Sequence, residues 1–125
     1  MEIERTKERV DKTGEVFTPK ELVQEMLSKL PEESFIDPNK SFIDPACGDG
    51  NFLVEVLNLK LSKNHDILQA LSNIYGIDIM EDNVQECKRR LLEIVGTHKQ
   101  FQDIIDKNIK VGDALKVKDF EFFFS

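Results

Sequence analysis

The chain has 125 residues, of which 40% are hydrophobic and 33% are charged, a composition that fits one folded domain with a modest core and excludes a largely disordered chain. No apolar run approaches the roughly 20 residues that span a bilayer, so we expect no membrane association. The net charge of −7 argues against a chain that binds duplex DNA by itself, since such binding depends on Lys and Arg neutralising phosphates.

Two further features of the sequence bear on its compartment. The N-terminal segment is charged and has no apolar signal core behind it. The two cysteines, Cys47 and Cys87, lie far apart and match no metal-binding or redox pattern. A cytoplasmic protein is the simplest interpretation, and Cys87, on the apolar face of a predicted helix, is expected in the core.

The beginning of the chain divides into an arm and the start of a domain. Residues 1–14 are highly charged and show no apolar period, which predicts a mobile or partner-dependent arm. Residues 15–125 hold all the predicted elements and are expected to form one domain.

The first predicted helix begins at Thr18, which can cap it, and Pro19, which suits the first helical position. Pro31 ends this helix, and the proline-containing residues 31–40 are expected to form a loop. Helical spacing predicts one apolar face, made of Leu22, Val23, Met26, Leu27 and Leu30.

Short apolar segments alternate with helical ones through the rest of the chain. Three segments have the composition of strands and each runs into an acid, at residues 41–44, 74–78 and 108–113. Helical periodicity occurs at residues 51–61, 62–73, 82–95 and 98–106. The aromatic residues 120–124 predict a fourth strand.

This alternation predicts an α/β fold with a parallel sheet. Asp44, Asp78 and Asp113 all fall at the carboxyl ends of predicted strands, and in such sheets those ends meet at one edge and bind ligands. We therefore expect at that edge a site for a ligand with several hydrogen-bond donors.

The loop after the first strand combines glycines with acids. Gly48 and Gly50 allow tight turns and the close approach of a ligand to the main chain, although the glycines alone are also typical of an ordinary strand–turn–helix connection. Asp44 and Asp49 flank them without any lysine, so the loop would repel a phosphate and attract ammonium and sulfonium groups. A dinucleotide oxidoreductase is disfavoured because the loop lacks Gly-x-Gly-x-x-Gly.

The full string from Asp44 to Leu53, Asp-Pro-Ala-Cys-Gly-Asp-Gly-Asn-Phe-Leu, resembles the methionine-binding motif of N6-adenine DNA methyltransferases, whose pattern is Asp-Pro-x-Cys-Gly-x-Gly-x-Phe-Leu. Residues 14–19 resemble the segment that precedes this motif in gamma-type and bifunctional restriction–modification enzymes. Residues 75–79 resemble the family's ribose-binding strand end, and residues 112–115 its adenine-contacting strand end. The four motifs follow the family's order across nearly the whole chain.

The resemblance implies a Rossmann-like class I methyltransferase fold, here truncated to about four parallel strands with flanking helices. Residues 15–125 would then be a partial methyltransferase domain. The implied cofactor is S-adenosylmethionine, with S-adenosylhomocysteine as product, and no metal site is implied.

The resemblance also implies which residues surround the methionine part of the cofactor. Phe17, Thr18 and Pro19 would line its adenosine and methionine side, a role compatible with helix capping. The remaining residues implied there are Asp44 near the ammonium, Ala46, Gly48 and Gly50 with cradling backbone, Cys47 as a small loop residue, and Phe52 packed beside the loop. Cys47 is not interpreted as a nucleophile, because the Pro-Cys pair of cytosine-C5 methyltransferases is interrupted here.

At the adenosine part, the resemblance implies that Asp78 takes the ribose hydroxyls, and a carboxylate can accept two such donors. Ile79 would lie against the adenine ring. Asp113 would accept from the adenine amino group, with Leu115 or Ala114 flanking the ring. The alternative for Asp78 is an exposed strand-end acid that caps a helix.

DNA is expected as a partner only through a larger or split enzyme. The basic run Lys88-Arg89-Arg90 is interpreted as a solvated helix face rather than a DNA contact. No proline follows Pro45, so the family's Asn/Asp/Ser-Pro-Pro-Tyr/Phe motif, which holds the flipped target base, is missing. We therefore assign no catalytic residue and expect the chain alone to be inactive.

Several interpretations of the missing motif stay open. The chain could be a fragment of a larger enzyme, one polypeptide of a split enzyme, or a non-catalytic S-adenosylmethionine-binding module that acts through protein interaction. A methyltransferase for another planar amide, such as a protein glutamine, would need the same motif. The aromatic residues 120–124 predict an edge strand that associates, so we expect a homo-oligomer or hetero-complex.

Overall fold

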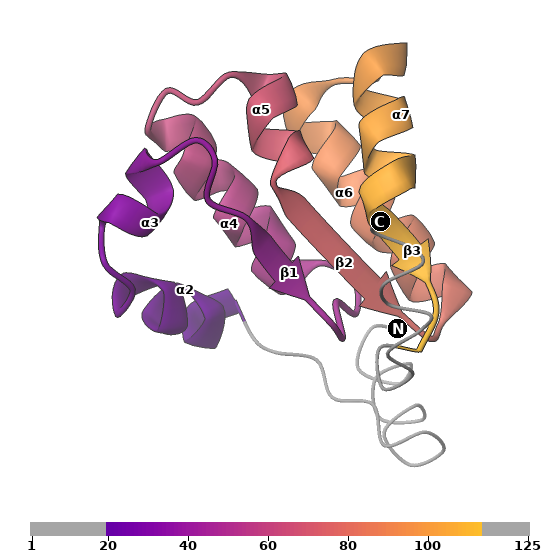
Figure 1. Cartoon of the computed structure of the whole chain (residues 1–125). Coiled ribbons are helices and arrows are strands. Elements are labelled where there is room, and N and C mark those ends of the chain that lie inside the picture. Colours follow the sequence, from indigo (N-terminus) through magenta and orange to yellow (C-terminus); the bar gives the residue numbers. More distant parts are fainter. Residues whose placement is uncertain (1–19, 114–125) are drawn as a thin grey trace.

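The structure, a computed structural model, describes residues 20–113. Within them, one parallel sheet contains β1 (Phe42–Asp44), β2 (Ile74–Asp78) and β3 (Ile109–Val111), in the order β1-β2-β3. The helices are α2 (Lys20–Ser28), α3 (Glu33–Ile36), α4 (Asn51–Ser62), α5 (Ile67–Ser72), α6 (Glu81–Val95) and α7 (Lys99–Asn108). Figure 1 shows α4 and α6 side by side behind the sheet, with α5 and α7 at its upper end.

The predicted α/β class is confirmed, and strands form at the three places where short apolar segments precede an acid. Between residues 20 and 113 the sheet has three strands, not the four or so that we expected. The predicted strand at residues 120–124 lies outside the described residues, as do the arm at residues 1–14 and the predicted helix start at Thr18 and Pro19.

The register of the sheet brings the strand ends together. Asp44 at the end of β1 is paired with Gly76 in β2, and Asp78 at the end of β2 is paired with Val111 in β3. Because neighbouring strands are parallel, the loops that follow them leave the sheet at the same edge. This carboxyl edge is where the predicted site residues are expected.

The core lies mainly between the sheet and the helices α4 and α6. Its members are nearly all apolar and almost fully inaccessible: Leu53, Val56 and Leu57 in α4, Ile74 and Ile77 in β2, and Val84, Cys87 and Leu91 in α6. Cys87 is therefore a core residue, as predicted.

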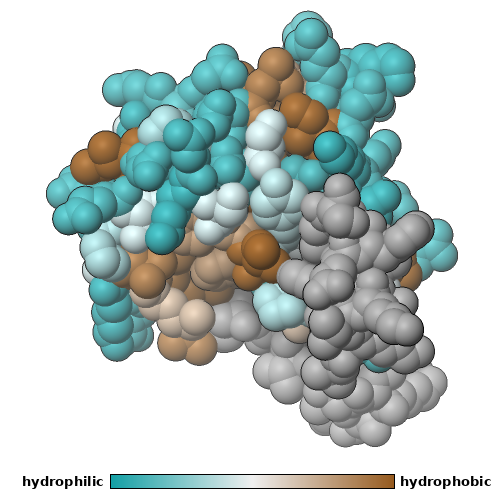
Figure 2. All heavy atoms as spheres, in the orientation of Figure 1, coloured by the Kyte–Doolittle hydropathy of each residue, from teal (hydrophilic) through white to brown (hydrophobic). Residues whose placement is uncertain are grey.

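The apolar face predicted for the first helix is buried at two of its five residues. Val23 and Leu27 are buried, but Leu22, Met26 and Leu30 are 46%, 48% and 40% exposed. The two buried residues lie one helical turn apart on the side of α2 that packs on α4, whereas the other three point elsewhere. Figure 2 shows hydrophobic side chains gathered on the surface over α2 and β1.

The predicted loop at residues 31–40 contains the short helix α3, which the sequence pattern did not indicate. Phe35 in α3 is buried, and its ring stacks on Phe42 at a centroid distance of 5.3 Å. This contact between a loop residue and a strand residue stabilises a turn of helix that has no amphipathic pattern of its own.

Lys60 in α4 is fully inaccessible, and its Nζ donates to the carbonyl oxygen of Lys40 at 2.8 Å and lies 5.1 Å from the centroid of the Phe42 ring. Burial lowers the pKa of this amine, against a smaller opposing effect of the Asp37 charge. Between the lowered value and the ordinary value of 10.5, the unfolded chain binds more protons, so Lys60 makes stability rise with pH there.

We expect the Lys60→Met variant to lose this contribution. Urea unfolding of wild type and variant, from about pH 7 to about pH 11, measures the difference between their free energies of unfolding. The free energy of unfolding of the wild type should rise relative to that of the variant as the pH rises. A difference independent of pH would contradict a lowered pKa at Lys60.

No helix between residues 20 and 113 combines the length and the apolar character needed to cross a membrane.

Candidate functional site

The loop between β1 and α4 is built around two glycines in the left-handed region. Gly48 has φ +54° and Gly50 has φ +98°, a conformation that costs other residues about 1–2 kcal/mol. Cys47 N donates to the carbonyl oxygen of Ile77 in β2 at 3.0 Å, and Gly50 N donates to the carbonyl oxygen of Cys47 at 2.9 Å. The loop is therefore folded back against the end of the central strand.

The space beside Gly50 also excludes a side chain at this position. A Cβ at this position would lie 2.9 Å from the Sγ of Cys87 and 3.2 Å from its Cα, well inside van der Waals contact. The loop thus lies directly on α6, and the left-handed turn and the close approach demand the same residue.

Asp44 at the end of β1 accepts a hydrogen bond from the Ala46 N–H at 3.1 Å, which closes a turn at the start of the loop. Burial raises the pKa of this carboxyl, the Ala46 N–H opposes the rise, and the charge of Asp78 adds to it. Burial and the charge of Asp78 both disfavour the ionised form of Asp44, so a cation bound beside Asp44 would stabilise that form.

Asp78 at the end of β2 accepts three hydrogen bonds. Its Oδ1 accepts from the Gly48 N–H at 3.2 Å, and its Oδ2 accepts from the Met80 N–H at 3.0 Å and from Asn83 Nδ2 at 3.2 Å. The side chain is nearly buried, at 8% exposed. Asp78 therefore joins the glycine loop, the end of β2 and the first turn of α6.

These contacts bear on the alternative given for Asp78, an exposed acid that caps a helix. Met80, not Asp78, occupies the position before α6, and it makes no side-chain capping bond, so Asp78 is not an ordinary helix cap. A carboxylate has about four acceptor positions, of which three are used here. A ribose diol bound to Asp78 would thus have to share the carboxylate with these donors or displace one of them.

Asn83 was not identified by the sequence analysis. Its side chain is fully inaccessible, and it donates to Asp78 from within the first turns of α6. A lone asparagine in a helical pattern carries no signal for this role, because the contact depends on how α6 returns to the strand end.

The remaining predicted site residues in the described part of the chain occupy different environments. Asp113 is half-buried just after β3, where Gly112 N donates to the carbonyl oxygen of Asp78 at 3.0 Å. Ile79 is 59% exposed at the end of β2. Ala46 is exposed, and Phe52 is half-buried in the first turn of α4, against the core. The structure therefore brings the three acids to one edge, with an exposed apolar side chain beside them.

Cys47 is buried beside the other cysteine. Its Sγ lies 3.7 Å from the carbonyl oxygen of Gly48. A hydrogen bond with Cys87, burial, and the charges of Cys87 and the nearby acids raise the pKa of the Cys47 thiol far above its ordinary value. The protonated thiol is a poor nucleophile, which supports the interpretation of Cys47 as a small loop residue.

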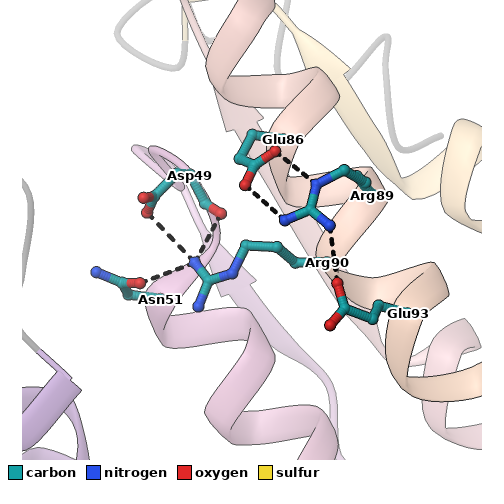
Figure 3. Close-up of polar contacts among 6 residues, drawn as sticks. All are labelled: Asp49, Asn51, Glu86, Arg89, Arg90 and Glu93. Atoms are coloured by element: carbon teal, nitrogen blue, oxygen red, sulfur yellow. Dashed lines mark hydrogen bonds and ion pairs between the residues drawn. The ribbon is translucent and has the colours of Figure 1, made fainter. Parts of the chain in front are cut away.

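Arg90, the last residue of the basic run at residues 88–90, does not lie on a solvated face. Its Nη1 donates to the carbonyl oxygen of Asp49 at 3.0 Å and to Oδ1 of Asn51 at 2.8 Å, and it lies 3.5 Å from Oδ1 of Asp49 (Figure 3). The interpretation of the whole basic run as solvated is therefore wrong at this position. Because Arg90 compensates Asp49, the negative charge expected on both sides of the glycines is concentrated on Asp44.

The other two cations of the run are paired with carboxylates away from the loop. Arg89 contacts Glu86 at 2.8 Å and Glu93 at 2.7 Å on the same helix (Figure 3), and Lys88 contacts Asp106 in α7 at 3.2 Å. Arg89, whose side chain is 58% exposed, agrees with the predicted solvated face, whereas Lys88, at 19% exposed, does not.

Five predicted site residues, Phe17, Thr18, Pro19, Ala114 and Leu115, lie outside the described residues. Between residues 20 and 113, no group of three or more His, Cys, Asp or Glu side chains could hold a metal ion. A cavity of about 330 Å³ lies between α2, α3 and α4. None of the predicted site residues between positions 20 and 113 lines it.

Comparison with known families decides what kind of protein carries this site. The family described as N-6 DNA Methylase matches residues 3–121. The chain belongs to this family. The resemblance first drawn from Asp44–Leu53 is thereby confirmed, and the three-stranded parallel sheet with its flanking helices is compatible with a methyltransferase-like fold.

This N-6 DNA methylase chain is also similar to a curated protein, the Type II methyltransferase M.VspI of Vibrio sp. (strain 343). The two are 31% identical over 105 residues, which cover 84% of this chain and 21% of the relative. The chain thus spans about a fifth of the length of that methyltransferase. No solved structure matches the chain.

Proposed function

We propose that this chain is the S-adenosylmethionine-binding portion of an adenine-N6 DNA methyltransferase with a Rossmann-like class I fold. The observation that carries the proposal is the carboxyl edge of the sheet, where Asp44 and Asp78 meet a loop held in shape by Gly48 and Gly50. The carboxylates of Asp44 and Asp78 suit a ligand with an ammonium and a sulfonium. The charge of the nearby Asp49 is compensated by Arg90.

Each part of the edge has a proposed role. Asp44 holds the ammonium, and the backbone of Ala46, Cys47, Gly48 and Gly50 surrounds the methionine part. Asp78 accepts from the ribose, Ile79 offers an apolar surface to the adenine ring, and Asp113 accepts from the adenine amino group. The bound cofactor supplies an electrophilic methyl group on sulfur.

We further propose that this chain binds the cofactor but does not position the target base. The sequence has no proline after Pro45 and therefore no Asn/Asp/Ser-Pro-Pro-Tyr/Phe motif. Methyl transfer requires the amine to be aligned with the methyl group, so the motif would come from further sequence of a longer protein or from a second polypeptide. The same observation supports a second candidate, a non-catalytic module that binds S-adenosylmethionine and acts through another protein.

Calorimetry with S-adenosylmethionine and S-adenosylhomocysteine tests the binding that both candidates require. We expect saturable binding of both ligands. No heat and no thermal shift at about millimolar ligand, where even a weak complex forms, would overturn both. A methylation assay on duplex DNA, with and without a supplied polypeptide that carries the motif, then separates the two candidates, since only the first predicts activity in the mixture.

The raised pKa of Asp44 predicts how binding depends on pH. A cationic ligand favours the ionised carboxylate, so binding releases a proton when the pH lies near or below the raised pKa. We expect the affinity for S-adenosylmethionine to increase as the pH rises from about 4 toward 7, below the pKa of about 8 that is ordinary for an α-amino group such as the ligand's. Asp44→Asn should bind more weakly and show a flatter dependence. An equally steep dependence in the variant would assign it to another group.

A further inference from the structure

Arg90 connects α6 with both sides of one glycine in the loop. Asp49 and Asn51 flank Gly50, and Nη1 of Arg90 donates to the main chain of the first and the side chain of the second (Figure 3). The Arg90 side chain is 27% exposed and that of Asp49 is 21% exposed, so these contacts are partly shielded from water. Charge-assisted bonds of this kind are stronger than bonds between neutral groups.

The contacts of Arg90 lie in the second half of the loop. The Gly48 N–H is held by Asp78 and the Cys47 N–H by β2. The carbonyl oxygen of Asp49 lies between the two left-handed glycines, and Arg90 donates to it and to the side chain of Asn51. Loss of Arg90 therefore removes contacts in the second half of the loop. It leaves Asp78, the proposed ribose acceptor, with its own hydrogen-bond partners.

We propose that Arg90 is a positioning residue for the part of the loop that receives the methionine end of the cofactor. This inference rests on the proposed function, because it assumes that the loop surrounds that end of S-adenosylmethionine. Arg90 is itself a cation, and a direct contact with an ammonium or sulfonium would be repulsive. Its role is thus to hold Asp49 and Asn51, not to touch these groups.

The adjacent residue supplies a matched control. Arg89 carries the same charge, but it is 58% exposed and contacts Glu86 and Glu93 within its own helix. Arg89→Gln therefore changes the net charge of the chain as Arg90→Gln does, without touching the loop.

The test compares three ligands of the full chain: S-adenosylhomocysteine, its decarboxylated analogue and adenosine. For Arg90→Gln we expect both ligands with a tail to bind about tenfold more weakly and adenosine to bind within about twofold of the wild type. Arg89→Gln should bind all three as the wild type does. Arg90→Lys, which keeps the charge but not the planar fork, should show a loss in the same direction, and it replaces Arg90→Gln if thermal unfolding shows that the latter does not fold.

The outcomes separate this inference from the proposed function. If the wild type binds none of the ligands, the proposed function fails. If the wild type binds and Arg90→Gln binds unchanged, or loses adenosine as strongly as S-adenosylhomocysteine, only the positioning role fails. A loss confined to the ligand that has a carboxylate would show a direct contact with that carboxylate, and it would overturn the inference as well.

Discussion

Replacing Gly50 by alanine is expected to lower the free energy of unfolding by about 3 kcal/mol, the combined cost of a left-handed alanine and of an overpacked contact. The new Cβ would lie 2.9 Å from the Sγ of Cys87, and α6 cannot move away without disturbing the core around it. Urea unfolding monitored by circular dichroism measures the change. A loss below about 1 kcal/mol would mean that the loop does not lie on α6 as described.

A double-mutant cycle with Cys87→Ala separates the two causes. Removing Sγ relieves part of the contact, so the cost of Gly50→Ala should be smaller in the Cys87→Ala background, by about 1 kcal/mol. Gly96→Ala is the control for dependence on residue 87: a Cβ there would meet nothing within 4 Å, although its ψ of 167° differs from the 13° of Gly50 at the same φ of +98°. Its cost comes from backbone strain alone and should not depend on residue 87.

The second large effect is expected at Asp78. In Asp78→Asn an amide group would face donors that now point at a carboxylate, so bonds from Gly48 N, Met80 N and Asn83 are weakened or lost. Hydrogen bonds to charged groups contribute about 1.5–3 kcal/mol each. We expect a loss of about 3 kcal/mol in stability, and an affinity for S-adenosylmethionine lower by about 10-fold or more.

Asp106→Asn provides the control for the change in charge. Asp106 is 66% exposed and pairs with Lys88, whose side chain is 19% exposed. Because the carboxylate itself is in water, its replacement should change stability by less than about 1 kcal/mol and leave the affinity unchanged. If Asp78→Asn lowers stability but binds the cofactor normally, Asp78 is a structural residue only. If it changes neither quantity, the three bonds described here do not form.

The sequence predicted the features that depend on local pattern. The short apolar segments that precede Asp44, Asp78 and Asp113 form strands whose carboxyl ends lie at one edge of the sheet, because the strands pair in parallel. The periodicity of residues 51–61 and 82–95 predicted α4 and α6 to within one residue. In these segments local preference and tertiary packing favour the same structure.

The features that were missed depend on contacts between distant segments. α3 forms because Phe35 stacks on Phe42, and the exposed side of α2 depends on where that helix meets α4. Asn83 and Arg90 are ordinary polar residues of a helix until the return of α6 to the loop gives them partners. Periodicity within one segment carries no information about such partners.

The burial of both cysteines at this edge offers an internal measure of local opening. Cys47 and Cys87 are 4% and 0% exposed, so a neutral alkylating reagent can reach either sulfur only when the loop separates from α6. The modification rate under native conditions would then report the free energy of that fluctuation, separately from global unfolding. A ligand that bridges the loop and the strand ends would slow the modification. The ratio of the modification rates without and with the ligand would then give its affinity, and the protein would need no attached label.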